Sequence, residues 1–246
     1  MGLAVARAMT DRRCPSSRAQ LEATQAVVTE PDALTYLSRS LRLRAGAQVE
    51  FFDGLGGARR AELTRLTKER IEGSWLEPLR LERRPNELAP VPILARQKRH
   101  GEDDALAALS ALGFPLIRVF QADRDQNLSA WGDKQRLRWA RITQDSCRQS
   151  GGFWCARVEA FESLGAAIED LEYVVYGDAA GAPLTHRVED RLGVVVGPEG
   201  GLSAQERALL DRRGGRGMRL GERTLRARHA ASLLPAVVMH HWWQQP

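Results

Sequence analysis

From residue 91 onward, short apolar runs alternate with segments of helical spacing, and this alternation constrains the fold more than any other feature. Apolar residues recur at helical spacing from Ala105 to Leu112, for example. Four runs have the composition of strands that are buried on both faces: Val91–Leu94, Leu116–Phe120, Tyr173–Tyr176 and Gly193–Val196. Strands that alternate with helices predict a mostly parallel sheet with helices on both sides. We therefore expect an α/β domain over residues 86–246.

The first 85 residues follow a different pattern. Alternating apolar residues around Val49, Ala61 and Trp75, with a glycine-rich turn at 54–57, predict short strands joined by tight turns. The sequence therefore predicts a small β-barrel over residues 21–85. Residues 1–20 show no apolar periodicity and are expected to form a flexible arm.

The positive charge is unevenly distributed. The chain has a net charge of +5, and the excess of cations lies in its first 100 residues. A second concentration lies between Arg207 and Arg228, where eight arginines accompany only two acidic residues. Two basic surfaces favour a polyanionic partner, nucleic acid before membrane. The alternative is that these are ordinary solvated faces, with arginine codons abundant in the genome.

The three cysteines indicate neither a metal site nor a disulfide framework. Their number is odd, their spacing fits no metal site, and a chain of 246 residues can fold without disulfides. No apolar run is long enough for a signal peptide or a membrane span. We expect a soluble, cytoplasmic protein without a metal.

The segment Gly193–Glu206 carries the clearest chemical signal. A buried strand ends in a loop with three glycines, and Ser203 with Glu206 has the spacing of a capping box that begins a helix. This order lets backbone amides face a ligand at the carboxyl edge of a sheet. An ordinary strand-to-helix turn is the alternative. The loop lacks the lysine of a phosphate-binding loop, which disfavours nucleoside triphosphates.

A second segment follows about twenty residues later, and the two together resemble a known family. Gly-Pro-Glu-Gly-Gly at 197–201 with Leu-Gly-Glu-Arg-Thr-Leu-Arg at 220–226 is similar to the RsmE group of SPOUT methyltransferases. Residues 37–54 are similar to the PUA-like barrel of that family. The resemblance implies a small PUA-like β-barrel followed by a trefoil-knotted α/β domain with a parallel sheet.

The resemblance also implies an activity. The family methylates N3 of a uridine in 16S ribosomal RNA with S-adenosylmethionine, which implies rRNA methylation on the small ribosomal subunit. It forms homodimers through the knotted region, and the apolar tail Ala230–Trp243 suits either a dimer helix or an internal core helix. The expected cofactor-binding residues are Tyr176, Gly177, Val196, Gly197, Glu199, Gly201, Leu220, Gly221 and Leu225.

Two arginines at motif positions are the expected catalytic residues. Methylation of uridine N3 requires stabilisation of the negative charge that develops on the base when its proton leaves. Arg226 is our first candidate for that role, with Arg223 second, and structural ion pairs are the alternative for both. Glu199 is expected to orient the glycine loop, because loop amides would stabilise its carboxylate.

The sequence departs from the family pattern at several polar positions. Arg228 stands where the family has a glutamate, and Arg148 and Gly152 stand where it has a glutamate and an arginine. The alternative function is therefore a catalytically weakened RNA-binding paralogue of the same fold that acts in ribosome assembly.

Overall fold

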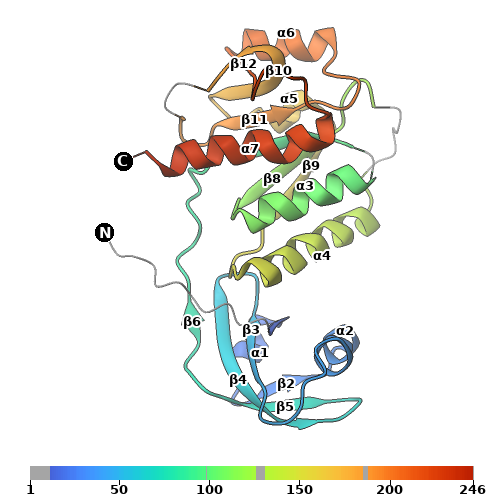
Figure 1. The fold of residues 1–246 in the computed structure, drawn as a ribbon, viewed down its shortest axis with the longest axis vertical. Helices are drawn as coiled ribbons and strands as arrows, with labels where there is room; N and C mark the ends of the chain where they lie inside the picture. Colours follow the sequence, from blue (N-terminus) through green and yellow to red (C-terminus); the bar gives the residue numbers. More distant parts are fainter. Residues whose placement is uncertain (1–11, 98, 126–130, 185–187, 246) are drawn as a thin grey trace. The chain divides into compact units, whose positions relative to one another are not determined.

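The structure is a computed structural model that describes residues 12–97, 99–125, 131–184 and 188–245 (Figure 1). The chain forms two compact units. The first comprises Met1–Arg84 together with Cys147–Cys155, and the second comprises Pro85–Ser146 together with Ala156–Pro246. Within the described ranges, no helix is both long and apolar enough to cross a membrane.

The first unit is built on a six-stranded sheet in the order β1-β3-β4-β5-β2, with β6 paired to β4. The pairing is antiparallel except between β1 and β3. The strands are β1 (Arg13–Pro15), β2 (Ala26–Val28), β3 (Gln48–Phe52), β4 (Gly57–Leu66), β5 (Ile71–Trp75) and β6 (Arg80–Leu81). The helical segments are α1 (Arg18–Glu22), α2 (Pro31–Thr35) and the π-helical turn η1 (Tyr36–Ser40).

A buried core and a tight turn account for the sheet of the first unit. Leu37, Phe51 and Ile71 are almost completely buried in its core. At the turn after β3, the Asp53 carboxylate accepts hydrogen bonds from the backbone N–H groups of Leu55 and Gly57, both at 2.8 Å. This side chain therefore replaces backbone partners and fixes the β3–β4 turn.

The expected arm over residues 1–20 is wrong for its described part. Residues 13–15 form β1, which pairs in parallel with β3, and Cys14 is completely buried. Arg13 is buried as well, in an ion pair with Glu50 at 2.8 Å. The strand has only three residues, too few for the periodicity on which the expectation depended. Residues 1–11 lie outside the described part.

The second unit has the predicted parallel sheet with helices on both sides. Its strand order is β12-β10-β11-β7-β8-β9, and every adjacent pair is parallel. The strands are β7 (Val91–Ala95), β8 (Leu116–Phe120), β9 (Arg157–Phe161), β10 (Val174–Ala182), β11 (Gly193–Val196) and β12 (Arg216–Met218). The helices are α3 (Arg99–Ala111), α4 (Asp133–Ser150), α5 (Leu164–Ala167), α6 (Ala204–Arg212) and α7 (Ala227–Trp243).

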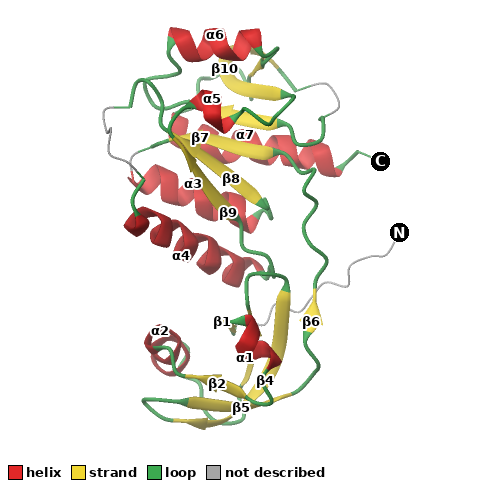
Figure 2. Ribbon diagram, turned by 180° about the vertical axis from the view of Figure 1, so that it is seen from behind, coloured by secondary structure: helices red, strands yellow, loops and turns green. Residues whose placement is uncertain are grey.

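The helices cover the two faces of this sheet in separate groups. Leu106 of α3, Trp139 of α4 and Leu234 of α7 pack with Val194 and Val196 of β11 on one face (Figure 1). Helices α5 and α6 pack on the other face, where α5 lies in front of the strands in Figure 2. Successive residues of β11 thus face opposite helical layers, as a strand buried on both sides requires.

Candidate active site

A cavity of about 810 Å³ lies in the second unit, beside the middle of β10 and the end of β11. Its walls come from the loop after β11, from the segment between β12 and α7, and from the start of α7. Ten of the eleven predicted site residues line it: Gly177, Val196, Gly197, Glu199, Gly201, Leu220, Gly221, Arg223, Leu225 and Arg226. The two motif segments, about twenty residues apart in sequence, therefore meet in one cavity.

The capping box predicted for α6 holds one end of the glycine loop. The Ser203 hydroxyl accepts from the Glu206 backbone N–H at 3.0 Å, and the buried Glu206 carboxylate accepts from the Ser203 N–H at 2.7 Å. The Ser203 hydroxyl also donates to the Asp123 carboxylate at 2.5 Å. The loop is therefore connected both to α6 and to the segment that follows β8.

Two glycines of this loop are needed for different reasons. Gly201 has a φ of +70°, and its N–H donates to the Pro198 carbonyl at 2.9 Å, so the turn uses a backbone conformation that favours glycine. A Cβ atom on Gly197 would lie 3.1 Å from Leu202 Cγ. Close packing against Leu202, rather than open space, therefore explains the glycine at 197.

The expected role of Glu199 is not found. Its side chain is exposed, and no hydrogen bond or ion pair to it occurs within the described residues. Arg124, which follows β8, contacts the loop instead: its Nη1 donates to the Gly200 carbonyl at 2.6 Å. A guanidinium from a distant segment thus supports the loop, which the local sequence could not indicate.

Tyr176 is the one predicted site residue that does not line the cavity. It is 8% exposed and packs in the core between the sheet and helices α5 and α6. It pairs with Val195, whose side chain lies in the same core, whereas the next residue, Gly177, reaches the cavity. Because side chains alternate along a strand, only one of two neighbours can face the cavity.

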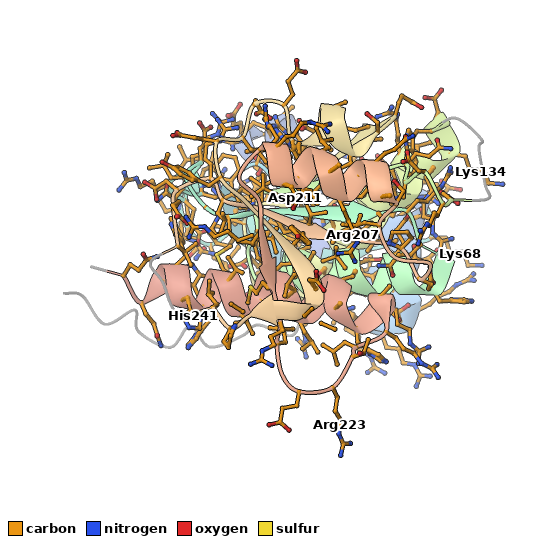
Figure 3. All side chains as sticks on the ribbon, turned by 90° about the horizontal axis from the view of Figure 1, so that it is seen from above. Lys68, Lys134, Arg207, Asp211, Arg223 and His241 are labelled. Carbon is orange, nitrogen blue, oxygen red and sulfur yellow. The ribbon has the colours of Figure 1, made fainter. Side chains whose placement is uncertain are left out.

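The second motif segment forms an exposed loop that ends where α7 begins. Figure 3 shows Arg223 at the tip of this loop, with its side chain pointing away from the rest of the chain. Arg226 is the N-cap residue of α7, and its carbonyl accepts from the N–H of His229 at 2.9 Å. The Arg226 backbone therefore fixes the helix start while its side chain stays exposed on the cavity wall.

Positive charge dominates the cavity wall. The charged lining residues are the carboxylates Asp178 and Glu199 and the arginines Arg207, Arg219, Arg223, Arg226 and Arg228. Arg207 pairs with Asp178 at 3.0 Å. Arg219, Arg223 and Arg226 have no carboxylate partner within the described part of the chain. Unpaired arginines at a cavity suit a negatively charged partner.

Asp178 and Arg207 belong to the cavity but were missed in the sequence. The backbone N–H of Ala180 and the Arg207 guanidinium both donate to the Asp178 carboxylate at 3.0 Å, and they hold its pKa below the usual range. The signal for Asp178 was its position directly after Gly177, just beyond the strand expected at Tyr173–Tyr176. Arg207 lies on α6, where nothing in the sequence separates it from other surface arginines.

The departures from the family pattern fall in two different places. Arg228 lines the cavity, and its Nε donates to His229 Nε2 at 3.3 Å. Arg148 and Gly152 belong to the first unit, where the Arg148 guanidinium lies 4.4 Å from the centre of the Tyr36 ring and the Gly152 carbonyl accepts from Arg13 at 2.7 Å. Of the three positions, Arg228 is the one that lines the cavity.

Among the residues that the structure describes, no group of three or more histidine, cysteine or acidic side chains is arranged to hold a metal ion. The glycines and backbone groups of the two loops are suited instead to close approach by an organic ligand.

Two family models match the chain, each over one of the predicted parts. The RNA methyltransferase PUA domain matches residues 28–74, and the RNA methyltransferase domain matches residues 86–239. The PUA-like part and the SPOUT-like parallel-sheet part of the predicted fold class are therefore confirmed.

Two relatives carry the name ribosomal RNA small subunit methyltransferase E. The Helicobacter pylori (strain J99) protein is 29% identical over 133 residues, which are 50% of this chain and 59% of the relative. The Synechocystis protein is 28% identical over 221 residues, which are 84% of this chain and 70% of the relative. This chain thus spans about three fifths of the Helicobacter protein.

A solved structure supports the same grouping. The ribosomal RNA small subunit methyltransferase E of Neisseria gonorrhoeae, bound to S-adenosylmethionine, is 25% identical and superposes with a TM-score of 0.77, covering 94% of this chain and 97% of that one. Together with the methyltransferase match over residues 86–239, these likenesses show that the chain belongs to the RsmE-like RNA methyltransferases that carry a PUA domain.

Proposed function

We propose that the protein transfers a methyl group from S-adenosylmethionine to N3 of a uridine in 16S ribosomal RNA. One observation carries the proposal: the two motif segments of the methyltransferase domain converge on a single cavity with unpaired arginines on its wall. The name and the bound cofactor of the Neisseria relative support both the substrate and the cofactor.

The cavity fits the proposed cofactor. A Cβ atom on Gly221 would have nothing within 4 Å, and one on Gly177 would meet only Leu234 at 3.5 Å and a carbonyl oxygen of Val195 at 4.0 Å. These open walls leave backbone N–H and C=O groups accessible to a flat base. Gly177, Val196, Gly197, Gly201, Leu220, Gly221 and Leu225 are the residues that would hold it.

The arginines fit the charge that the reaction develops. S-adenosylmethionine, when bound, supplies a methyl group on a positively charged sulfur. When the proton leaves uridine N3, negative charge spreads over the nitrogen and the two flanking carbonyl oxygens, and a nearby guanidinium stabilises it. The position of Arg226 on the cavity wall supports this role for its side chain, and the position of Arg223 at the tip of its loop supports contact with a neighbouring phosphate.

The proposed setting is the cytoplasm, with ribosomal RNA or the small ribosomal subunit as partner and a homodimer as the assembly. Helix α7 offers support for the dimer. One side of it is buried against the sheet, while Leu233 and Trp243 are 49% and 55% exposed. Apolar side chains of this size are stabilised when a second copy covers them.

Arg228 supports the second candidate function, an RNA-binding paralogue with weakened catalysis. It adds a cation to a wall that already carries three unpaired arginines. Such a protein would hold RNA at this wall without transferring a methyl group. Cofactor affinity separates the two candidates, because only the enzyme requires S-adenosylmethionine.

Calorimetric titration with S-adenosylmethionine tests the proposed pocket. We expect the native chain to bind it, Gly177→Leu to lose at least tenfold in affinity because the added side chain fills the space beside Leu234, and Gly177→Ala to bind nearly as well as the native chain. Thermal unfolding verifies that both variants are folded. If the native chain does not bind, or if folded Gly177→Leu binds unchanged, the proposed pocket is wrong.

A further inference from the structure

Two of the three cysteines lie side by side in the first unit. Cys147 is in the last turn of α4, Cys155 follows eight residues later, and each thiol shifts the pKa of the other. Both belong to an apolar cluster with Phe52 and Phe153. Cys147 is 1% exposed, whereas Cys155 is only half-buried.

The backbone around the pair holds both sulfur atoms in place. The Cys155 N–H donates to the Gly54 carbonyl at 2.9 Å, and a Cβ atom on Gly54 would lie 2.6 Å from the Cys155 sulfur. The Cys147 thiol donates to the Gly152 carbonyl at 3.0 Å. The segment 147–155 therefore folds back within the first unit, where both thiols join the same apolar cluster.

A buried cation lies next to the pair. The Arg13 guanidinium donates to the carbonyls of Cys147 and Gly152, each at 2.7 Å. The neighbouring Cys147 thiol and the charge of Arg13 lower the pKa of Cys155 against the effects of burial and of Asp53. The neighbouring Cys155 and burial raise the pKa of Cys147. Cys155 is thus the more acidic thiol of the pair.

Cys14 has none of these features. It is completely buried in the core of the first unit, and burial raises its pKa to about 12. Since thiolates react with oxidants and buried thiols are inert, Cys14 provides an internal reference for the reactivity of the pair.

We propose that Cys147 and Cys155 form a reversible oxidation site for peroxides, with Cys155 as the attacking sulfur and Cys147 as its partner. The Cys155 thiolate attacks one peroxide oxygen, the O–O bond breaks, and with hydrogen peroxide the leaving hydroxide takes up a proton to become water. The Cys147 sulfur then attacks the resulting sulfenic acid, forms the S–S bond and releases a second water. Two thiols are oxidised and one hydrogen peroxide is reduced to two waters, independently of the proposed methyl transfer.

Peptide mapping of the native full chain tests this site directly. Trypsin cleaves after Arg141, Arg148 and Arg157, so the two cysteines fall in separate peptides, 142–148 and 149–157. After treatment with a few equivalents of hydrogen peroxide, we expect these peptides to appear as one disulfide-linked species and to separate again after reduction. The peptide 14–18, with Cys14, should remain a free thiol.

Two serine variants complete the experiment. Cys155→Ser should remove the linked species and leave Cys147 reduced, while Cys14→Ser should form the link at the native rate. Because Cys14 is buried, the mapping of the native chain stands on its own if Cys14→Ser fails to fold. Oxidation of Cys14 as fast as Cys155, disulfides between two chains, or sulfinic acid without the linked peptide would each overturn the proposal.

Discussion

Arg226 has a structural role at the start of α7 and a proposed catalytic role in the cavity. Its backbone begins α7 and its side chain reaches the cavity wall, with no carboxylate partner in the described part of the chain. From the motif, Arg226 was the first candidate and Arg223 the second. The structure separates them, because Arg223 points away from the chain at the end of its loop (Figure 3). Tyr176 shows the limit of motif reasoning, since strand alternation turns it into the core.

Replacing Arg226 tests its proposed role. We expect Arg226→Ala to lower methyl transfer by about 10²- to 10³-fold, the usual loss when one group that stabilises developing charge is removed. Affinity for S-adenosylmethionine should stay within about twofold of the native value. Arg226→Lys keeps the positive charge but lacks the planar guanidinium, so its rate of methyl transfer should lie between those of the native chain and Arg226→Ala. If Arg226→Ala loses cofactor binding instead, the arginine has a structural role.

Glu102 on α3 is a buried carboxylate that should make stability depend on pH. It is 4% exposed and accepts from the Trp139 indole and the Gln135 amide, both at 2.7 Å. Burial raises its pKa in spite of these hydrogen bonds. The folded state therefore binds the proton more tightly than the unfolded state, whose glutamate pKa is about 4.3, and stability is lost as the pH rises through the folded pKa.

Glu102→Gln removes this loss because glutamine does not ionise. We expect the free energy of unfolding of Glu102→Gln, minus that of the native chain, to be larger at pH 7 than at pH 4, so that the variant gains relative stability as the pH rises. Urea unfolding at both pH values measures the difference, and Asp104→Asn removes an exposed carboxylate from the same helix as a control. A difference that is independent of pH, or that has the opposite sign, would show that burial does not govern this carboxylate.

The observed strands and helices agree with the predicted ones where apolar runs or capping residues are clear in the sequence. The strands Leu116–Phe120 and Gly193–Val196 have the predicted bounds, and the predicted Ser203–Glu206 capping box is present. These features depend on neighbouring residues, so the local sequence contains them. Strand β1 depends on pairing with β3 and on the distant Glu50, which local periodicity cannot reveal.

Ser203 is the N-cap of α6 and follows the glycine loop of the cavity, and Ser163, the N-cap of α5, provides a control. Ser203→Ala should lower the free energy of unfolding by about 1 kcal/mol and weaken S-adenosylmethionine binding, because the hydroxyl also holds Asp123. Ser163 caps α5 by accepting from the Ala166 N–H and lies outside the glycine loop, so Ser163→Ala should cost stability alone. Equal effects of both variants on cofactor affinity would contradict this link.

The division of the whole chain into units exceeds what the sequence could predict. The segment 147–155 joins the first unit through Arg13, which donates to a carbonyl 134 residues away. Composition and periodicity give no signal for such a contact. The structure of the whole chain also shows where part of the arginine excess lies, because several arginines of the segment Arg207–Arg228 line one cavity. Their position, more than their number, favours an RNA substrate.

The measurement that decides the proposed activity is nucleoside analysis after the full chain is incubated with methyl-labelled S-adenosylmethionine and either free 16S RNA or small ribosomal subunits. We predict label in 3-methyluridine and in no other nucleoside, with the label lost in Arg226→Ala. Label in a different nucleoside, or no label from a chain that binds the cofactor, would contradict uridine N3 methylation.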